Sequence, residues 1–235
     1  MGRKKKTVNR LRDAVATARN ANQAFWDRVF KLGFRGLTNA ELAELACVHP
    51  STIGRELGGL DAIATRGIGE HDYWNPFFKK FRLDGKDKKV SRQVRGMFME
   101  MMQANFVAFM ENDYMQHAIL AQISVESETL TKISEARERE AAELLNLADL
   151  NFSGSGICFR AVMALILYGI YGLGLHARYN KSTVCGIDIN KEKDYQKVKA
   201  TIAYMIHLIW IDAGLKKKRK KRHREKIIGY EIDFE

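Results

Sequence analysis

The chain has 235 residues, enough for one large domain or for a small domain attached to a larger one, and 46% of them are hydrophobic. Only 2 prolines occur, which favours helices, and the three widely spaced cysteines have neither the number nor the spacing of a disulfide framework or a Cys/His metal site. The net charge of +11 is concentrated in residues 1–12 and 215–226, so the body between them is mildly acidic. Such basic ends either bind a polyanion or remain solvated.

Neither the N-terminal segment nor the longest apolar run favours export or insertion into a membrane. The N-terminus is basic but lacks an apolar run, so it does not have the form of a secretory signal, and reduced cysteines suit the cytoplasm. The longest apolar run, residues 161–175, is shorter than the roughly 18–20 residues of a membrane span. We therefore expect a buried helix there, a cytoplasmic location and no membrane partner.

The first predicted element is a long helix over residues 7–32, preceded by a basic arm of Arg3, Lys4, Lys5 and Lys6. Thr38 with Glu41 three residues later then predicts the capped start of a second helix. Its apolar positions repeat at helical spacing, so it has one inward face.

A third, shorter helix is predicted from Pro50, because proline suits a first helical turn. Ile53 and Leu57 lie four residues apart and face inward, while Ser51, Thr52 and Arg55 point to the opposite side. The glycines at 58 and 59 end the helix. A helix with an apolar back and a small, polar and basic front is typical of helices that enter the DNA major groove. The structural alternative is an ordinary helical hairpin within a core.

The segments 33–38, 42–43 and 52–53, with Val48 between them, resemble the DNA-binding domain of the TetR (tetracycline-repressor) family at the family's spacing. The resemblance runs without a gap to about Ile63 and covers roughly a fifth of the chain. It implies a homodimeric DNA-binding regulator whose second domain holds a small-molecule effector.

Three positions depart from the family pattern. Cys47 stands where the family usually has a turn glycine, Gly54 where it usually has a tyrosine that touches a phosphate, and Leu60 where it often has a lysine. Residues 49–57 also resemble the helix-turn-helix of some insertion-sequence transposases. A transposase would need an acidic catalytic domain with strands, and this chain continues as helices.

After a fourth helix over residues 60–69 and an aromatic break at 71–78, a polar connector at 82–89 leads to a methionine-rich helix over 91–111. That helix is either plain core or the wall of a permissive pocket, because methionine adapts its shape to varied ligands. Further helices are predicted over residues 113–123, 127–148, 157–179 and 193–215. The last two offer more apolar surface than a compact monomer covers, and the resemblance implies a four-helix interface between two copies.

We thus expect an all-α protein with an N-terminal three-helix helix-turn-helix domain at residues 1–69. A helical ligand-binding and dimerisation domain at 70–215 and a basic tail at 216–235 would follow. The residues expected to contact DNA are Arg3, Lys4, Lys5, Lys6, Thr38, His49, Pro50, Ser51, Thr52, Gly54 and Arg55. The residues expected to line the ligand pocket are Met101, Met102, Phe106, Met110, His117 and Phe159. The residues expected at the dimer interface are Gly169, Gly172, Ile202, Ile206 and Trp210.

The sequence contains no recognisable catalytic motif. Its six histidines are scattered, and neither a phosphate loop nor a nucleophile motif is present. We expect a non-enzymatic regulator without cofactor or metal that binds a palindromic double-stranded operator as a homodimer and is released by a small apolar or amphipathic effector. The alternative is an effector-free accessory or architectural helix-turn-helix protein, for example of a mobile element.

Overall fold

The computed structural model describes residues 2–74, 78 and 91–232, with side chains at 14–74, 78 and 92–220. The connector expected at 82–89 lies outside the described residues. Across the described part of the chain the structure is helical, with no β-strand and one isolated bridge between Val184 and Ile187. The predicted all-α class is confirmed.

The chain divides into two compact units. Unit 1 comprises Met1–Pro76 and Asn112–Glu138, and unit 2 comprises Phe77–Glu111 and Arg139–Glu235. The functional division expected at 69/70 and 215/216 stays a prediction. The two compact units do not coincide with these predicted domains, because the chain returns to unit 1 after residue 111.

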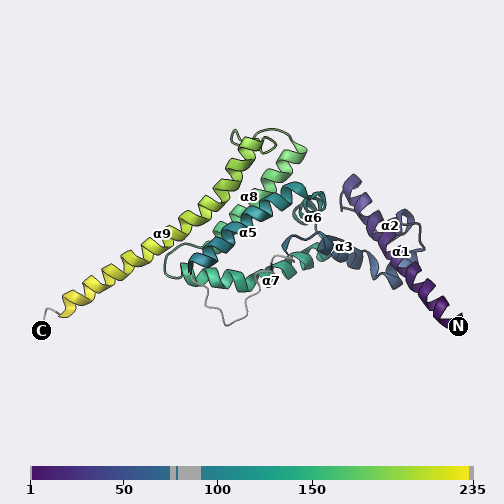
Figure 1. Cartoon of the computed structure of the whole chain (residues 1–235), viewed down its shortest axis with the longest axis horizontal. Helices are drawn as coiled ribbons and strands as arrows, with labels where there is room; N and C mark the ends of the chain where they lie inside the picture. Colours follow the sequence, from purple (N-terminus) through teal and green to yellow (C-terminus); the bar gives the residue numbers. More distant parts are fainter. Residues whose placement is uncertain (1, 75–77, 79–90, 233–235) are drawn as a thin grey trace. The chain divides into compact units, whose positions relative to one another are not determined.

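The described residues of unit 1 form five helices and the start of a sixth, which Figure 1 labels. In chain order they are α1 (Gly2–Leu32), α2 (Asn39–Leu45), the π-helix η1 (Thr52–Glu56), α3 (Gly59–Glu70), α6 (Asp113–Ser124) and the first part of α7 (Glu128–Phe152). The helix predicted from residue 7 begins at Gly2, because the basic residues before it are themselves good helix formers. Helix α6 packs against α1 and α3.

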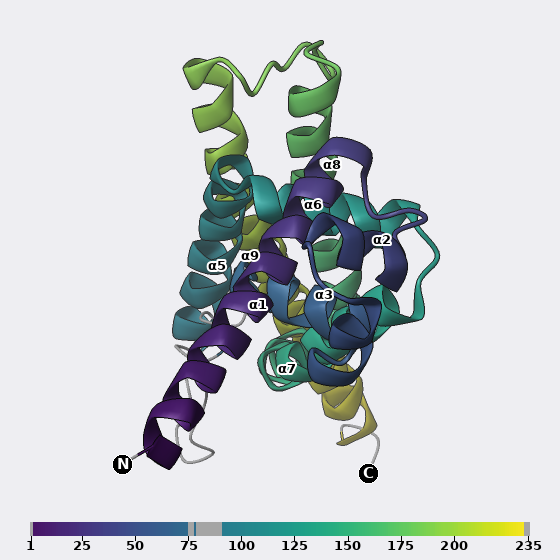
Figure 2. The same cartoon turned by 90° about the vertical axis from the view of Figure 1, so that its right-hand side faces the viewer.

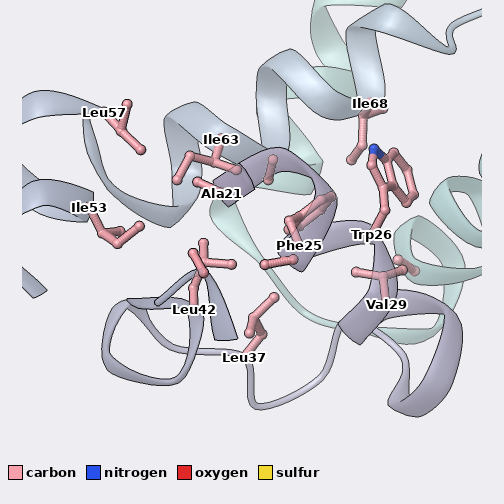
Figure 3. Packing of buried hydrophobic residues seen from close by; sticks show 14 of the residues in the cluster. Ala21, Phe25, Trp26, Val29, Leu37, Leu42, Ile53, Leu57, Ile63 and Ile68 are labelled. Atoms are coloured by element: carbon pink, nitrogen blue, oxygen red, sulfur yellow. The ribbon is translucent and has the colours of Figure 1, made fainter. Parts of the chain in front are cut away.

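The core of unit 1 forms where α1 crosses the helices that follow it. Phe25 is 1% exposed and lies in the middle of a cluster toward which Leu42, Ile53 and Ile63 point (Figure 3). Each of these residues comes from a different helix, so burying their apolar surface fixes the helices against one another. Trp26 extends the same core toward Ile68.

Unit 2 is built on α5 (Ser91–Glu111), which packs against both α8 (Phe159–Tyr179) and α9 (Glu192–Ile232) (Figure 1). Helices α8 and α9 run in opposite directions and are joined by residues 180–191, at the top of Figure 2. The helix predicted to end at 215 continues to Ile232, since its basic run contains no residue that breaks a helix.

One side of α8 and one side of α9 remain uncovered in a single chain. Leu165 and Tyr168 of α8 are 75% and 61% exposed, and Tyr204 of α9 is 59% exposed. A single chain therefore leaves part of the apolar surface of these two helices exposed, as their composition predicted. Both α8 and the stretch Glu192–Lys220 are long and apolar enough to cross a membrane by length and composition, and 39% and 28% of their most apolar 18-residue windows are buried.

Candidate nucleic-acid interface and ligand site

The start of α2 is held by its own cap and by α1. Thr38 has extended backbone, and its Oγ1 accepts a hydrogen bond from the Glu41 N–H at 3.2 Å, as the capping pattern predicted. The Glu41 carboxylate pairs with Arg28 Nε of α1. Arg28 also donates to the Gly33 carbonyl at 2.6 Å. Arg28 therefore fixes the loop between α1 and α2, a role that its sequence position did not reveal.

The turn after α2 requires a left-handed residue. Cys47 has a φ of 54° and is exposed, at the position where the TetR family usually has glycine. A residue with a Cβ costs roughly 1–2 kcal/mol in this conformation. The Val48 N–H donates to the Ala43 carbonyl at 2.9 Å and closes the turn. The chain thus keeps the turn geometry although it lacks the glycine.

The helix that follows is wider than the predicted α-helix. The Leu57 N–H donates to the Thr52 carbonyl at 3.1 Å, a bond that spans five residues and defines a π-turn. The predicted inward pair is nevertheless correct, because Ile53 is 0% and Leu57 8% exposed. Gly58 and Gly59 end the helix with φ values of 80° and 81°. Short π-helical segments of this kind are frequent at functional sites.

The outer face of η1 and of the turn before it is small, polar and basic. His49, Pro50, Ser51, Gly54 and Arg55 are exposed, and Thr52 is half-buried. Arg55 forms no hydrogen bond or ion pair with any described residue. Its five guanidinium donors are therefore available to an outside acceptor.

His49 orders the start of this face. Its Nδ1 lies 3.2 Å from the Ser51 backbone nitrogen and 2.7 Å from Ser51 Oγ. Because a backbone N–H can only donate, Nδ1 accepts, and the ring proton of the neutral imidazole resides on Nε2. The ring thereby keeps one donor for another molecule while it fixes Ser51.

Asn39 braces η1 from its far end. Asn39 Oδ1 accepts a hydrogen bond from the Leu60 N–H at 2.6 Å. Gly58, the formal cap of α3, has no side chain for this task, so a residue of α2 caps the first turn of α3 instead. Arg66 Nη2 donates to the Leu57 carbonyl at 3.3 Å and satisfies the end of η1.

The predicted basic arm belongs to α1. Arg3, Lys4, Lys5 and Lys6 lie in the first two turns of that helix, and their side chains are outside the described set. They are therefore carried by a helix and not by an extended chain.

The predicted pocket residues divide between the two units. Met101, Met102, Phe106 and Phe159 are buried in unit 2, and Met110 is half-buried there. His117 belongs to unit 1, where its ring lies 4.7 Å from that of Phe30.

A buried amide that the sequence analysis missed lies among the methionines of α5. Asn105 is 0% exposed, and neither its Oδ1 nor its Nδ2 has a hydrogen-bond partner among the described residues. Leaving such a group unsatisfied costs about 1–3 kcal/mol. The sequence did contain a signal for this buried amide, because Asn105 occupies a core position in the helical pattern of Phe98, Met102 and Phe109. The next residue is Phe106, whose ring lies 4.8 Å from that of Tyr195, and burial raises the pKa of the Tyr195 phenol.

The residues expected at a dimer interface do not share one environment. Ile202, Ile206 and Trp210 are 5%, 0% and 7% exposed, so they are already covered within the interior of unit 2 of a single chain. Helical periodicity identified an apolar face, but α5 covers that face. Gly169 and Gly172 of α8 are exposed, as an interface would require.

Among the residues that the structure describes, no group of three or more His, Cys, Asp and Glu side chains could hold a metal ion. Neither a protein-family profile nor a curated protein matches the sequence. A TetR family transcription regulator from Marinobacter aquaeolei VT8 is similar in structure, with a TM-score of 0.52, 15% sequence identity, 86% coverage of this chain and 97% of that one. The chain therefore has the all-helical fold of a TetR family transcription regulator.

Proposed function

We propose that the protein is a homodimeric, sequence-specific DNA-binding transcription regulator that reads its operator with η1. The observation that carries this proposal is the exposed face of η1, with Arg55 unengaged and Ile53 anchored in the core. Asn39 and Arg66 hold the backbone around this face. A braced helix with an outward guanidinium can form a bidentate contact with guanine.

A second copy is the partner that suits the exposed stripes of α8 and α9. The stripe on α8 contains Leu165, Tyr168, Gly169 and Gly172, and the stripe on α9 contains Tyr204, Met205, Leu208, Ile211 and Leu215. A two-fold pair buries the same stripes on both copies and presents two η1 helices to a palindromic operator. The small residues Gly169 and Gly172 have no atom within 4 Å of a built Cβ, so another helix can approach them closely.

Regulation by a small apolar or amphipathic effector is part of the proposal, with α5 as the wall of the site. The competing function is that of an effector-free accessory DNA-binding protein. The basic run of α9 favours it, since Lys216, Lys218, Arg219 and Lys220 are exposed and could bind any duplex. Sequence selectivity distinguishes the two functions, because phosphate contacts carry no base information.

Selection of bound duplexes from a random DNA pool tests the proposal. An enriched palindrome is expected, and Arg55→Ala should weaken binding to it by roughly 1–3 kcal/mol while binding to random duplexes stays nearly unchanged. Arg92→Ala, which removes an exposed arginine from α5 in unit 2, is the matched control and should alter neither. Absence of any enriched sequence, or equal losses on both duplexes with Arg55→Ala, would favour the accessory protein.

A further inference from the structure

Among the described side chains of unit 2, the buried amide of Asn105 stands apart because it has no hydrogen-bond partner. Gln103, two residues earlier on α5, donates from Nε2 to the Lys199 carbonyl at 2.9 Å. Ser155, the other buried polar residue described in unit 2, donates to the Phe152 carbonyl and accepts from the Ile157 N–H. Within the described side chains of this unit, Asn105 alone keeps a buried donor and a buried acceptor unpaired.

Aromatic contacts between α5 and α8 show which part of α8 lies opposite Asn105. Phe98 lies 4.9 Å from Phe159, and Phe109 lies 4.7 Å from Tyr171, so α8 runs alongside α5 in the same direction. Asn105 falls between these two ring pairs. By interpolation it lies opposite the middle of α8, near Ile166.

The same reasoning applies to α9, which runs the other way. Phe106 lies 4.8 Å from Tyr195, and Phe98 lies 6.4 Å from Trp210. By interpolation, and in line with the hydrogen bond from Gln103 to the Lys199 carbonyl, Asn105 lies near Val198, which is half-buried. The amide is thus enclosed by an apolar section between two aromatic clusters.

The composition of this section matches that of small-molecule sites. Apolar surroundings with one well-placed polar group are typical of small-molecule sites, where the polar group fixes the orientation of the ligand. The flanking Met101 and Met102 have flexible, polarisable side chains that can move aside for a ligand. A carboxamide offers one acceptor oxygen and two donor hydrogens. A ligand group that can both donate and accept a hydrogen bond would therefore satisfy both the Oδ1 and the Nδ2 of Asn105.

We propose that Asn105 is the polar anchor of the effector site, and that the effector has an apolar body ending in a carboxamide, lactam or carboxylic acid. This inference rests on the proposed function and specifies the chemical class of its effector. The Asn105 amide would form two parallel hydrogen bonds with that group, while the aromatic clusters hold the apolar body.

A matched pair of probes tests the assignment. Nonanamide and decan-2-one have the same chain length and shape and differ in carrying NH2 or CH3 on the carbonyl. The affinity of each is measured by titration calorimetry on the full chain. Wild type is expected to bind nonanamide at least tenfold more tightly than decan-2-one. Asn105→Leu should abolish this preference and raise the melting temperature of the ligand-free protein, because it removes an unsatisfied amide of similar size.

Two further variants serve as controls for the role of Asn105. Gln103→Leu removes an amide that already has a partner, so it should lower stability and keep the tenfold preference. Asn105→Ala leaves more space than Leu and serves if the leucine variant does not fold, and it should bind both probes equally. The inference is overturned if wild type binds neither probe, or binds both equally, or if the preference survives both substitutions at 105. Operator binding without probe is measured in parallel. If wild type does not bind the operator, the result counts against the proposed function and not against this site.

Discussion

The side chain of Asn39 in α2 caps the first turn of α3 by accepting the Leu60 N–H at 2.6 Å. The two helices flank η1 in the chain, so this bond joins the residues before and after the segment that would meet DNA. A cap usually comes from the residue before its own helix. Here the glycines that end η1 cannot supply it, and a residue 21 positions earlier does.

Asn39→Ala should therefore loosen η1 without touching its exposed face. Loss of the cap is expected to lower the free energy of unfolding by about 1 kcal/mol, measured by urea denaturation. Operator affinity should fall with it, because η1 would sample more orientations. Asn39→Asp keeps the acceptor and is the control. If both variants lose the same stability, the hydrogen bond is not the cause.

The departure at Gly54 gives a prediction on DNA affinity. Its φ is not in the left-handed region, and no atom lies within 4 Å of a built Cβ, so a larger side chain fits. Gly54→Tyr restores the phosphate-touching residue of the resemblance and should strengthen binding to operator and random duplexes alike, by about 1 kcal/mol or roughly fivefold. The slope of log affinity against log salt should stay unchanged, because a neutral phenol displaces no counterion.

Gly54→Ala is the matched control for this gain. It removes the backbone freedom of glycine and should stabilise the helix by up to about 1 kcal/mol, yet it adds no hydroxyl. If alanine strengthens DNA binding as much as tyrosine does, ordering of η1 and not a phosphate contact explains the effect.

Two glycines of α3 should respond oppositely to the same substitution. A Cβ on Gly67 would lie 2.7 Å from Asn22 Oδ1 and 3.1 Å from Trp26 Nε1 of α1, whereas a Cβ on Gly69 meets nothing within 4 Å. Gly67→Ala should cost about 1–3 kcal/mol of stability through overpacking, while Gly69→Ala should be neutral or stabilising. The urea midpoints of the two variants decide this. Equal midpoints would mean that α1 and α3 approach less closely than described.

The helix-turn-helix could be predicted because its signals are local. Thr38 caps the helix that begins next to it, and the glycines at 58 and 59 adopt the left-handed backbone that ends η1. The π-turn between Thr52 and Leu57 could not be predicted, since periodicity indicates which residues face inward and not which carbonyl the Leu57 N–H bonds to. The bonds of Arg28 and Asn39 link residues 13 and 21 positions apart, and one sequence gives no means of pairing them.

The second unit shows a different limit of sequence reasoning. The periodicity of 193–215 correctly identified apolar residues, but α9 has apolar residues on two faces. One face, with Ile206, packs inside the chain, and the other, with Met205, is exposed. Hydrophobicity alone does not decide which face meets its own chain. Asn105 was overlooked for a related reason, because an amide in an apolar helix looks like a solvated position until its burial is known.

Met205 and Ile206 are adjacent in α9 and test the proposed dimer directly. Met205 is 41% exposed within one chain, and Ile206 is fully buried. Met205→Asp adds a charge to the exposed stripe and should convert the dimer into a folded monomer with the 26.9 kDa mass of the chain. Ile206→Asp should unfold unit 2 instead, because it buries an unpaired charge. Light scattering for mass and circular dichroism for helix content separate the two outcomes.

Leu32→Asp is the control, since Leu32 is 71% exposed on α1 in unit 1 and should tolerate the charge without a change in mass. A wild-type protein that remains monomeric at micromolar concentration would contradict the dimer. The exposed stripes of α8 and α9 could instead bind a lipid membrane, and flotation with lipid vesicles tests this alternative. If wild type floats with the vesicles and Met205→Asp does not, the stripes of α8 and α9 meet lipid and not a second copy. We expect wild type to stay in the aqueous fraction as a dimer, because two-fold burial of these stripes removes the apolar surface that would otherwise partition into lipid.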